Sequence, residues 1–127
     1  MRVAIAGAGY IAAIHARAVK NSGGEVVAVI EKFPEIGAQF ARRFRVKNQF
    51  ENVEQALEAT QFEALVIGTP NYLHAPQAIA ALSAGVAVMV EKPMALNAAE
   101  CQKMAEASQK SGAPLMVAHC WRFDQDV

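Results

Sequence analysis

Glycines and charged residues directly follow several short apolar runs of this sequence. The run Val3–Ala6 leads into Gly7-Ala8-Gly9-Tyr10-Ile11-Ala12, a G-x-G-x-x-A segment that opens a helical pattern. Such a segment provides a tight turn, a close backbone approach to a pyrophosphate and close helix–strand packing. The helix start adds unpaired N–H groups and a positive dipole end. This context predicts dinucleotide binding, with a purely structural turn as the alternative. The predicted cofactor-binding residues are Gly7, Gly9, Tyr10, Ile11 and Ala12.

A carboxylate, Glu31, directly follows the second apolar run, Val26–Ile30. At that place in a nucleotide-binding unit, a carboxylate accepts hydrogen bonds from the adenosine ribose and repels a 2′-phosphate. The sequence therefore favours NAD over NADP. Lys32, Arg42 and Arg43 keep NADP open, and a solvated helix face is the alternative explanation for these three bases.

Two further apolar runs also end in polar loops. Ala64–Ile67 is followed by Gly68-Thr69-Pro70-Asn71, and His74 comes three residues later. Pro70 should hold Thr69 extended, so that the loop leaves the sheet before the next helix begins. Asn71 and His74 should then be displayed at the ligand-binding edge, although Asn71 alone could be a turn residue.

The segment Glu91-Lys92-Pro93 directly follows the run Val86–Val90. A charged pair has no packing role at the end of a buried strand. A lysine there could polarise the hydroxyl or carbonyl of a substrate, or move its proton. The alternative is a solvated or salt-bridged strand end. A cis bond before Pro93 is left open.

The apolar runs are continuous, which is typical of parallel strands buried on both faces. Helical patterns separate them, and such alternation predicts βαβ crossovers. We therefore predict a Rossmann-type, doubly wound parallel sheet in a three-layer α/β/α arrangement, as a single domain over residues 1–127. Ligands of such sheets bind beyond the carboxyl ends of the strands, where all these loops should meet.

Helix boundaries and faces are also predicted. Asn97 with Glu100 is typical of an N-terminal cap, and Gly85 and Gly112 suit helix ends. The spacing of Ile11, Ile14 and Ala18 predicts the buried face of the first helix. His15 should lie on that face as a packed histidine.

Composition excludes several classes of protein. The chain has 127 residues, of which 12 are basic and 12 acidic. This balance argues against a nucleic-acid-binding arm, which would show an excess of basic residues. No apolar run approaches a membrane span. Two cysteines and three histidines show no metal-ligand spacing. We expect a cytoplasmic protein with reduced thiols. The apolar fraction of 54% suggests an exposed face that a partner covers, and hence self-association.

Taken together, these motifs and His119…Arg122-Phe123 resemble the N-terminal half of the Gfo/Idh/MocA (glucose–fructose oxidoreductase / inositol dehydrogenase) family. The resemblance implies an NAD(P)-dependent oxidoreductase that transfers a hydride at a carbinol or carbonyl carbon of sugars or cyclitols. It further implies a pyrophosphate loop at Gly7, Gly9 and Ala12, and an adenosine ribose contact at Glu31. Thr69, Pro70, Asn71 and His74 would line the cofactor cleft, and Glu91 would lie near the nicotinamide ribose. Lys92 would be the catalytic lysine, and Arg122 would bind near the cofactor and the interdomain face.

Members of that family continue into a second domain for substrate binding and dimerisation. We expect this chain to lack it, because the pattern is complete near Phe123 and the chain ends at Val127. As an isolated chain it should bind the cofactor weakly and turn over little or no substrate. The alternative is a stand-alone, non-catalytic nucleotide-binding module that serves as a sensor or partner subunit. Glu91-Lys92-Pro93 favours the enzyme ancestry, since a sensor needs no lysine at the nicotinamide.

Overall fold

The short apolar runs form one parallel sheet in the computed structural model, which describes residues 1–124. Over that range the sheet has six strands in the order β3-β2-β1-β4-β5-β6, and all neighbouring pairs are parallel. The strands are β1 (Arg2–Ala6), β2 (Glu25–Ile30), β3 (Asn48–Phe50), β4 (Ala64–Ile67), β5 (Ala87–Val90) and β6 (Leu115–Val117). The strand order reverses between β1 and β4, as in doubly wound folds. The predicted fold class is confirmed.

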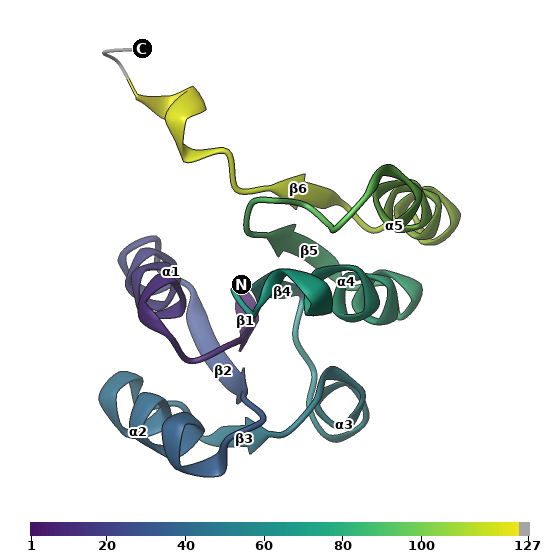
Figure 1. Ribbon diagram of the computed structural model, residues 1–127. Helices are drawn as coiled ribbons and strands as arrows, with labels where there is room; N and C mark the ends of the chain where they lie inside the picture. Colours follow the sequence, from purple (N-terminus) through teal and green to yellow (C-terminus); the bar gives the residue numbers. More distant parts are fainter. Residues whose placement is uncertain (125–127) are drawn as a thin grey trace.

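Helices cover both faces of this sheet (Figure 1). One layer holds α1 (Tyr10–Asn21) and α2 (Pro34–Phe44), and the other holds α3 (Val53–Ala59), α4 (His74–Ser83) and α5 (Ala98–Ser111). Short 3-10 helices, η1 (Asn71–Leu73) and η2 (Cys120–Phe123), precede α4 and follow β6. Alternate residues of β1 serve the two layers: Val3 and Ile5 pack toward α1 and α2, while Ala4 and Ala6 pack toward α3, α4 and α5.

The predicted helix ends are confirmed. The Asn97 side chain accepts a hydrogen bond from the Glu100 N–H at 2.9 Å, which satisfies one donor of the first turn of α5. Gly112 ends the same helix in the left-handed conformation, with φ of +76°, where glycine has no steric penalty. No helix in residues 1–124 has the length and apolar character of a membrane span.

The predicted buried face of α1 is wrong. Ala12, Ala13 and Ala16 face the core, whereas Ile14 is 40% exposed. The reason is the close approach of this helix to the end of β4: a Cβ added to Gly68 would lie 3.8 Å from the backbone nitrogen of Ala12 in the helix. Such close approach selects alanine for the buried positions, although isoleucine is more hydrophobic.

Candidate functional site

The carboxyl ends of β1, β2 and β4 are joined by backbone hydrogen bonds at the first glycine turn. The Gly7 N–H donates to Ile30 O at 2.8 Å, and the Gly68 N–H donates to Ala6 O at 2.8 Å. Gly7 has φ of +94°, and a Cβ there would lie 2.7 Å from Gly68 O. Both conformation and space therefore require glycine at position 7.

Gly9 plays a different part in the same turn. It caps the N-terminus of α1 in extended backbone conformation, and no side chain caps that end of the helix. A Cβ on Gly9 would have no heavy atom within 4 Å. Open space therefore lies over a helix end whose N–H groups and dipole suit phosphate oxygens.

Glu31 holds a fixed position at the end of β2. One carboxylate oxygen, Oε2, accepts the Ala8 N–H at 3.1 Å, and the other, Oε1, accepts the Phe33 N–H at 3.1 Å. These bonds tie the carboxylate to the glycine turn. Each oxygen retains acceptor capacity for a ribose hydroxyl.

A cavity of about 580 Å³ opens between these strand ends. Its lining residues come from the loops after β1, β2, β3 and β4, and they include Gly7, Gly9, Glu31, Lys32, Asn52, Thr69, Pro70, Tyr72 and Gln77. The glycine turn, the open helix end and the Glu31 carboxylate together fit the pyrophosphate and adenosine ribose of a dinucleotide. Sequence reasoning missed Asn52, Tyr72 and Gln77. Of these, Asn52 could have been found as a typical N-cap residue directly before helix α3, where its side chain accepts the Gln55 N–H.

A second cavity of about 290 Å³ continues toward β5. It shares Gly68 and Thr69 with the first cavity, and its other lining residues are Ile11, Asn71, His74, Glu91 and Lys92. Lys92 is exposed at its rim, so the ammonium is open to solvent beside the cavity. Glu31 lines the first cavity and Lys92 lines the second, so the carboxylate and the lysine lie at opposite ends of the two adjoining cavities.

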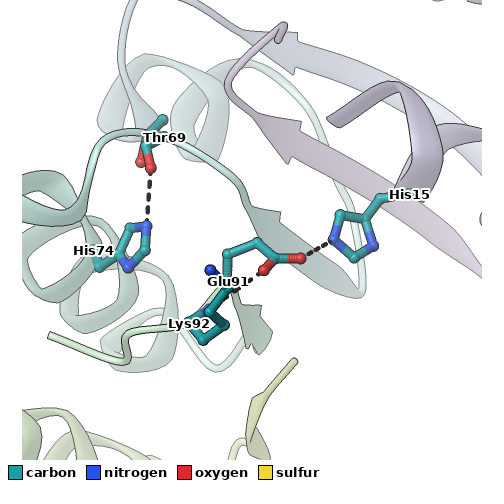
Figure 2. Close-up of polar contacts among 5 residues, drawn as sticks. All are labelled: His15, Thr69, His74, Glu91 and Lys92. Carbon is teal, nitrogen blue, oxygen red and sulfur yellow. Dashed lines mark hydrogen bonds and ion pairs between the residues drawn. The ribbon is translucent and has the colours of Figure 1, made fainter. Parts of the chain in front are cut away.

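His74 joins the two loops that line this second cavity. Its ring is 1% exposed, with Nδ1 2.8 Å from Pro93 O and Nε2 2.9 Å from Thr69 O. Figure 2 shows the ring beside Thr69. A neutral ring donates to one of these carbonyls at a time, and a doubly protonated ring donates to both. His74 is therefore a buried residue that connects the two loops of the site. The peptide bond between Lys92 and Pro93, which the sequence left open, is cis.

Replacing His74 by alanine should lower the free energy of unfolding by about 2 kcal/mol, because two loop carbonyls lose their partner and a cavity remains. Urea denaturation of the wild-type chain and the variant measures this difference. The matched control is His119→Ala, because His119 is exposed. A His74→Ala midpoint equal to that of the control would contradict the linking role.

His15 contacts Glu91, a residue of the second cavity, and sequence reasoning missed this contact. It was predicted to pack in the core, but its Nε2 lies 2.6 Å from Glu91 Oε1. Figure 2 shows the Glu91 side chain reaching toward His15, away from Thr69 and His74. The two residues are 76 positions apart, and no local sequence signal connects them.

Other predicted residues lie outside the two cavities. Tyr10 is 84% exposed and lines a groove between α1 and α2. Ala12 is fully buried and supports the turn by packing. Arg122 lies in η2, which projects beyond β6 (Figure 1), and it lines neither cavity. Its neighbours Trp121 and Phe123 are 70% and 75% exposed.

Comparison with known proteins agrees with this geometry. The GFO_IDH_MocA family model, described as an oxidoreductase family with an NAD-binding Rossmann fold, matches residues 1–119. The chain belongs to the Gfo/Idh/MocA family. It is an NAD-binding oxidoreductase domain of that family, as the motifs predict.

Two curated relatives of this Gfo/Idh/MocA domain are named as dehydrogenases. It is 36% identical to 4-carboxy-2-hydroxymuconate-6-semialdehyde dehydrogenase of Sphingobium sp. over 98% of the chain and 40% of that protein. It is 33% identical to inositol 2-dehydrogenase of Leifsonia xyli over 99% of the chain and 38% of that protein. The chain therefore spans about two fifths of the length of these relatives.

The fold also matches solved structures. The WlbA dehydrogenase of Bordetella pertussis, crystallised with NADH and UDP-GlcNAcA, superimposes with a TM-score of 0.92 at 30% identity. That match covers 97% of this chain and 36% of the other. The WlbA dehydrogenase from Chromobacterium, in complex with the same two ligands, gives a TM-score of 0.88 at 28% identity, over 93% and 34% of the two chains.

Proposed function

We propose that this Gfo/Idh/MocA domain presents NAD for hydride transfer at a carbinol or carbonyl carbon of a sugar-like or cyclitol substrate. The observation that carries the proposal is the pair of adjoining cavities, with Glu31 at one end and Lys92 at the other. Relatives such as inositol 2-dehydrogenase support the substrate class.

In this proposal the cofactor lies along the strand ends. The pyrophosphate rests on the turn at Gly7 and Gly9 and on the N-terminus of α1, while Glu31 binds the adenosine ribose. Toward β5 the cleft is lined by Thr69, Pro70, Asn71 and His74, and Glu91 lies beside the nicotinamide ribose. The bound cofactor supplies the hydride acceptor or donor.

Lys92 is the proposed catalytic residue. Its ammonium is exposed at the rim of the second cavity, where a substrate oxygen can reach it. Lys92 would donate a hydrogen bond to that oxygen and exchange a proton with it as the carbon changes between carbinol and carbonyl. The cleft needs a second wall to hold the substrate in line for this chemistry.

The isolated chain should therefore bind cofactor and turn over little or no substrate. We also propose that the exposed apolar side chains of β6 and η2, Met116, Trp121 and Phe123, mediate self-association, and that Arg122 lies on the same face. The free thiols Cys101 and Cys120 support a cytoplasmic location, where cysteines stay reduced.

The test combines binding, turnover and assembly on the purified 127-residue chain. Calorimetric titration with NADH and NADPH should show binding, with NADH preferred. Absorbance assays with a panel of polyols and NAD should show little or no turnover, and sedimentation should show association at high concentration. If neither cofactor binds, the cofactor proposal is contradicted. Rapid turnover of a polyol would contradict the expected lack of turnover by this chain alone, and a strict monomer would contradict the proposed self-association.

A further inference from the structure

We propose that His15 is a positioning residue that keeps the Glu91 carboxylate away from the Lys92 ammonium, so that Lys92 stays available to the substrate. The inference rests on the proposed function, in which Lys92 exchanges a proton with the substrate. His15 touches neither of the two cavities and acts through Glu91.

Both oxygens of the Glu91 carboxylate have partners in the protein. Oε1 lies 2.6 Å from His15 Nε2, and since an ionised carboxylate only accepts, that ring nitrogen carries the hydrogen. Oε2 accepts the backbone N–H of Lys92 at 3.3 Å. Within residues 1–124, Glu91 forms its ion pair with His15, and the Lys92 ammonium forms none.

The contact is better protected than an ordinary surface pair. The side chains of His15 and Glu91 are each only 14% exposed, and the lower dielectric of a partly buried site strengthens a hydrogen bond. His15 lies on α1 between Ala12 and Ala16, which are both fully buried against the sheet. The ring is therefore held on a helix segment that cannot shift without disturbing the core.

Without His15 the carboxylate would have an obvious alternative partner. Lys92 follows Glu91 directly in the sequence, and its long side chain can approach the freed oxygen. A carboxylate beside an ammonium favours the protonated amine, which cannot accept a proton from a substrate hydroxyl. Directing Glu91 toward α1 prevents this pairing.

The chemical reactivity of Lys92 tests the proposal without cofactor or substrate. Wild type, His15→Leu, His15→Gln and the double variant His15→Leu/Glu91→Gln are treated with acetic anhydride at pH 8. Mass spectrometry then compares acetylation of Lys92 with that of Lys103, an exposed lysine on α5. Circular dichroism confirms folding, and His15→Asn, whose amide is too short to reach Glu91, replaces His15→Leu if that variant does not fold.

We expect His15→Leu to slow Lys92 acetylation about threefold to fivefold, the effect of one partly exposed ion pair. His15→Gln keeps an N–H donor and should react like wild type, and Glu91→Gln in the double variant should restore the rate. An unchanged rate in His15→Leu, or a slow rate that Glu91→Gln does not restore, overturns the proposal. Failure of the proposed function would instead appear as absent NADH binding, which is measured separately.

Discussion

Replacing Gly9 by alanine should weaken NADH binding at least about tenfold while leaving the fold intact. The new methyl group would occupy the space over the N-terminus of α1 in which the backbone must approach the pyrophosphate. Gly9 has φ of −84° and ψ of −167°, and nothing lies within 4 Å of the added carbon. Alanine is therefore unstrained there, and stability should be unchanged or slightly higher. Calorimetric titration and thermal unfolding measure the two quantities.

The matched variant is Gly7→Ala, in the same turn. Here the methyl group would meet Gly68 O at 2.7 Å with φ of +94°, so the free energy of unfolding should fall by about 3 kcal/mol or more. Comparing Gly9→Ala with Gly7→Ala therefore separates the effect on NADH binding from the effect on the free energy of unfolding. Wild-type NADH affinity in Gly9→Ala would show that the phosphates do not lie on this turn.

Replacing Glu31 by glutamine should largely remove the preference for NADH over NADPH. The wild-type carboxylate is fixed by two backbone N–H groups and would face the 2′-phosphate of NADPH. Losing its charge should cost about tenfold in NADH affinity and relieve the repulsion of NADPH, which the adjacent Lys32 can bind. Titration of both cofactors gives the ratio of affinities before and after the substitution.

Glu35→Gln is the control for Glu31→Gln. Glu35 is an exposed carboxylate in the first turn of α2 and lies outside the lining of the larger cavity. The substitution Glu35→Gln removes the same charge from the same region, and the variant should keep its preference for NADH over NADPH. An unchanged ratio of affinities in Glu31→Gln would mean that Glu31 does not contact the adenosine ribose.

The predictable part of this protein follows from the geometry of parallel sheets. Strands buried on both faces leave continuous apolar runs such as Val26–Ile30, and the loops that follow them must share one edge. Gly7, Glu31 and Lys92 could therefore be assigned to that edge from sequence order alone. The N-cap at Asn97 was equally accessible, because capping depends on residues three positions apart.

The remaining features depend on distances that a linear pattern does not contain. The buried face of α1 is set by how closely that helix lies on the sheet, so Ala16 is buried and Ile14 is exposed. The contact between His15 and Glu91 joins two elements far apart in the chain. His74 was predicted to be displayed at the edge, but it is buried, and its two ring nitrogens lie within hydrogen-bond distance of two loop carbonyls.

We predict that NAD binds at the edge of the sheet formed by the carboxyl ends of β1, β2 and β4. The most direct measurement is a calorimetric titration of the 127-residue chain with NADH. We predict saturable binding at one site per chain, with a dissociation constant of about 1 mM or lower, weakened by Gly9→Ala. No saturable binding of either NADH or NADPH at millimolar concentration, by a chain that circular dichroism shows to be folded, would contradict this account.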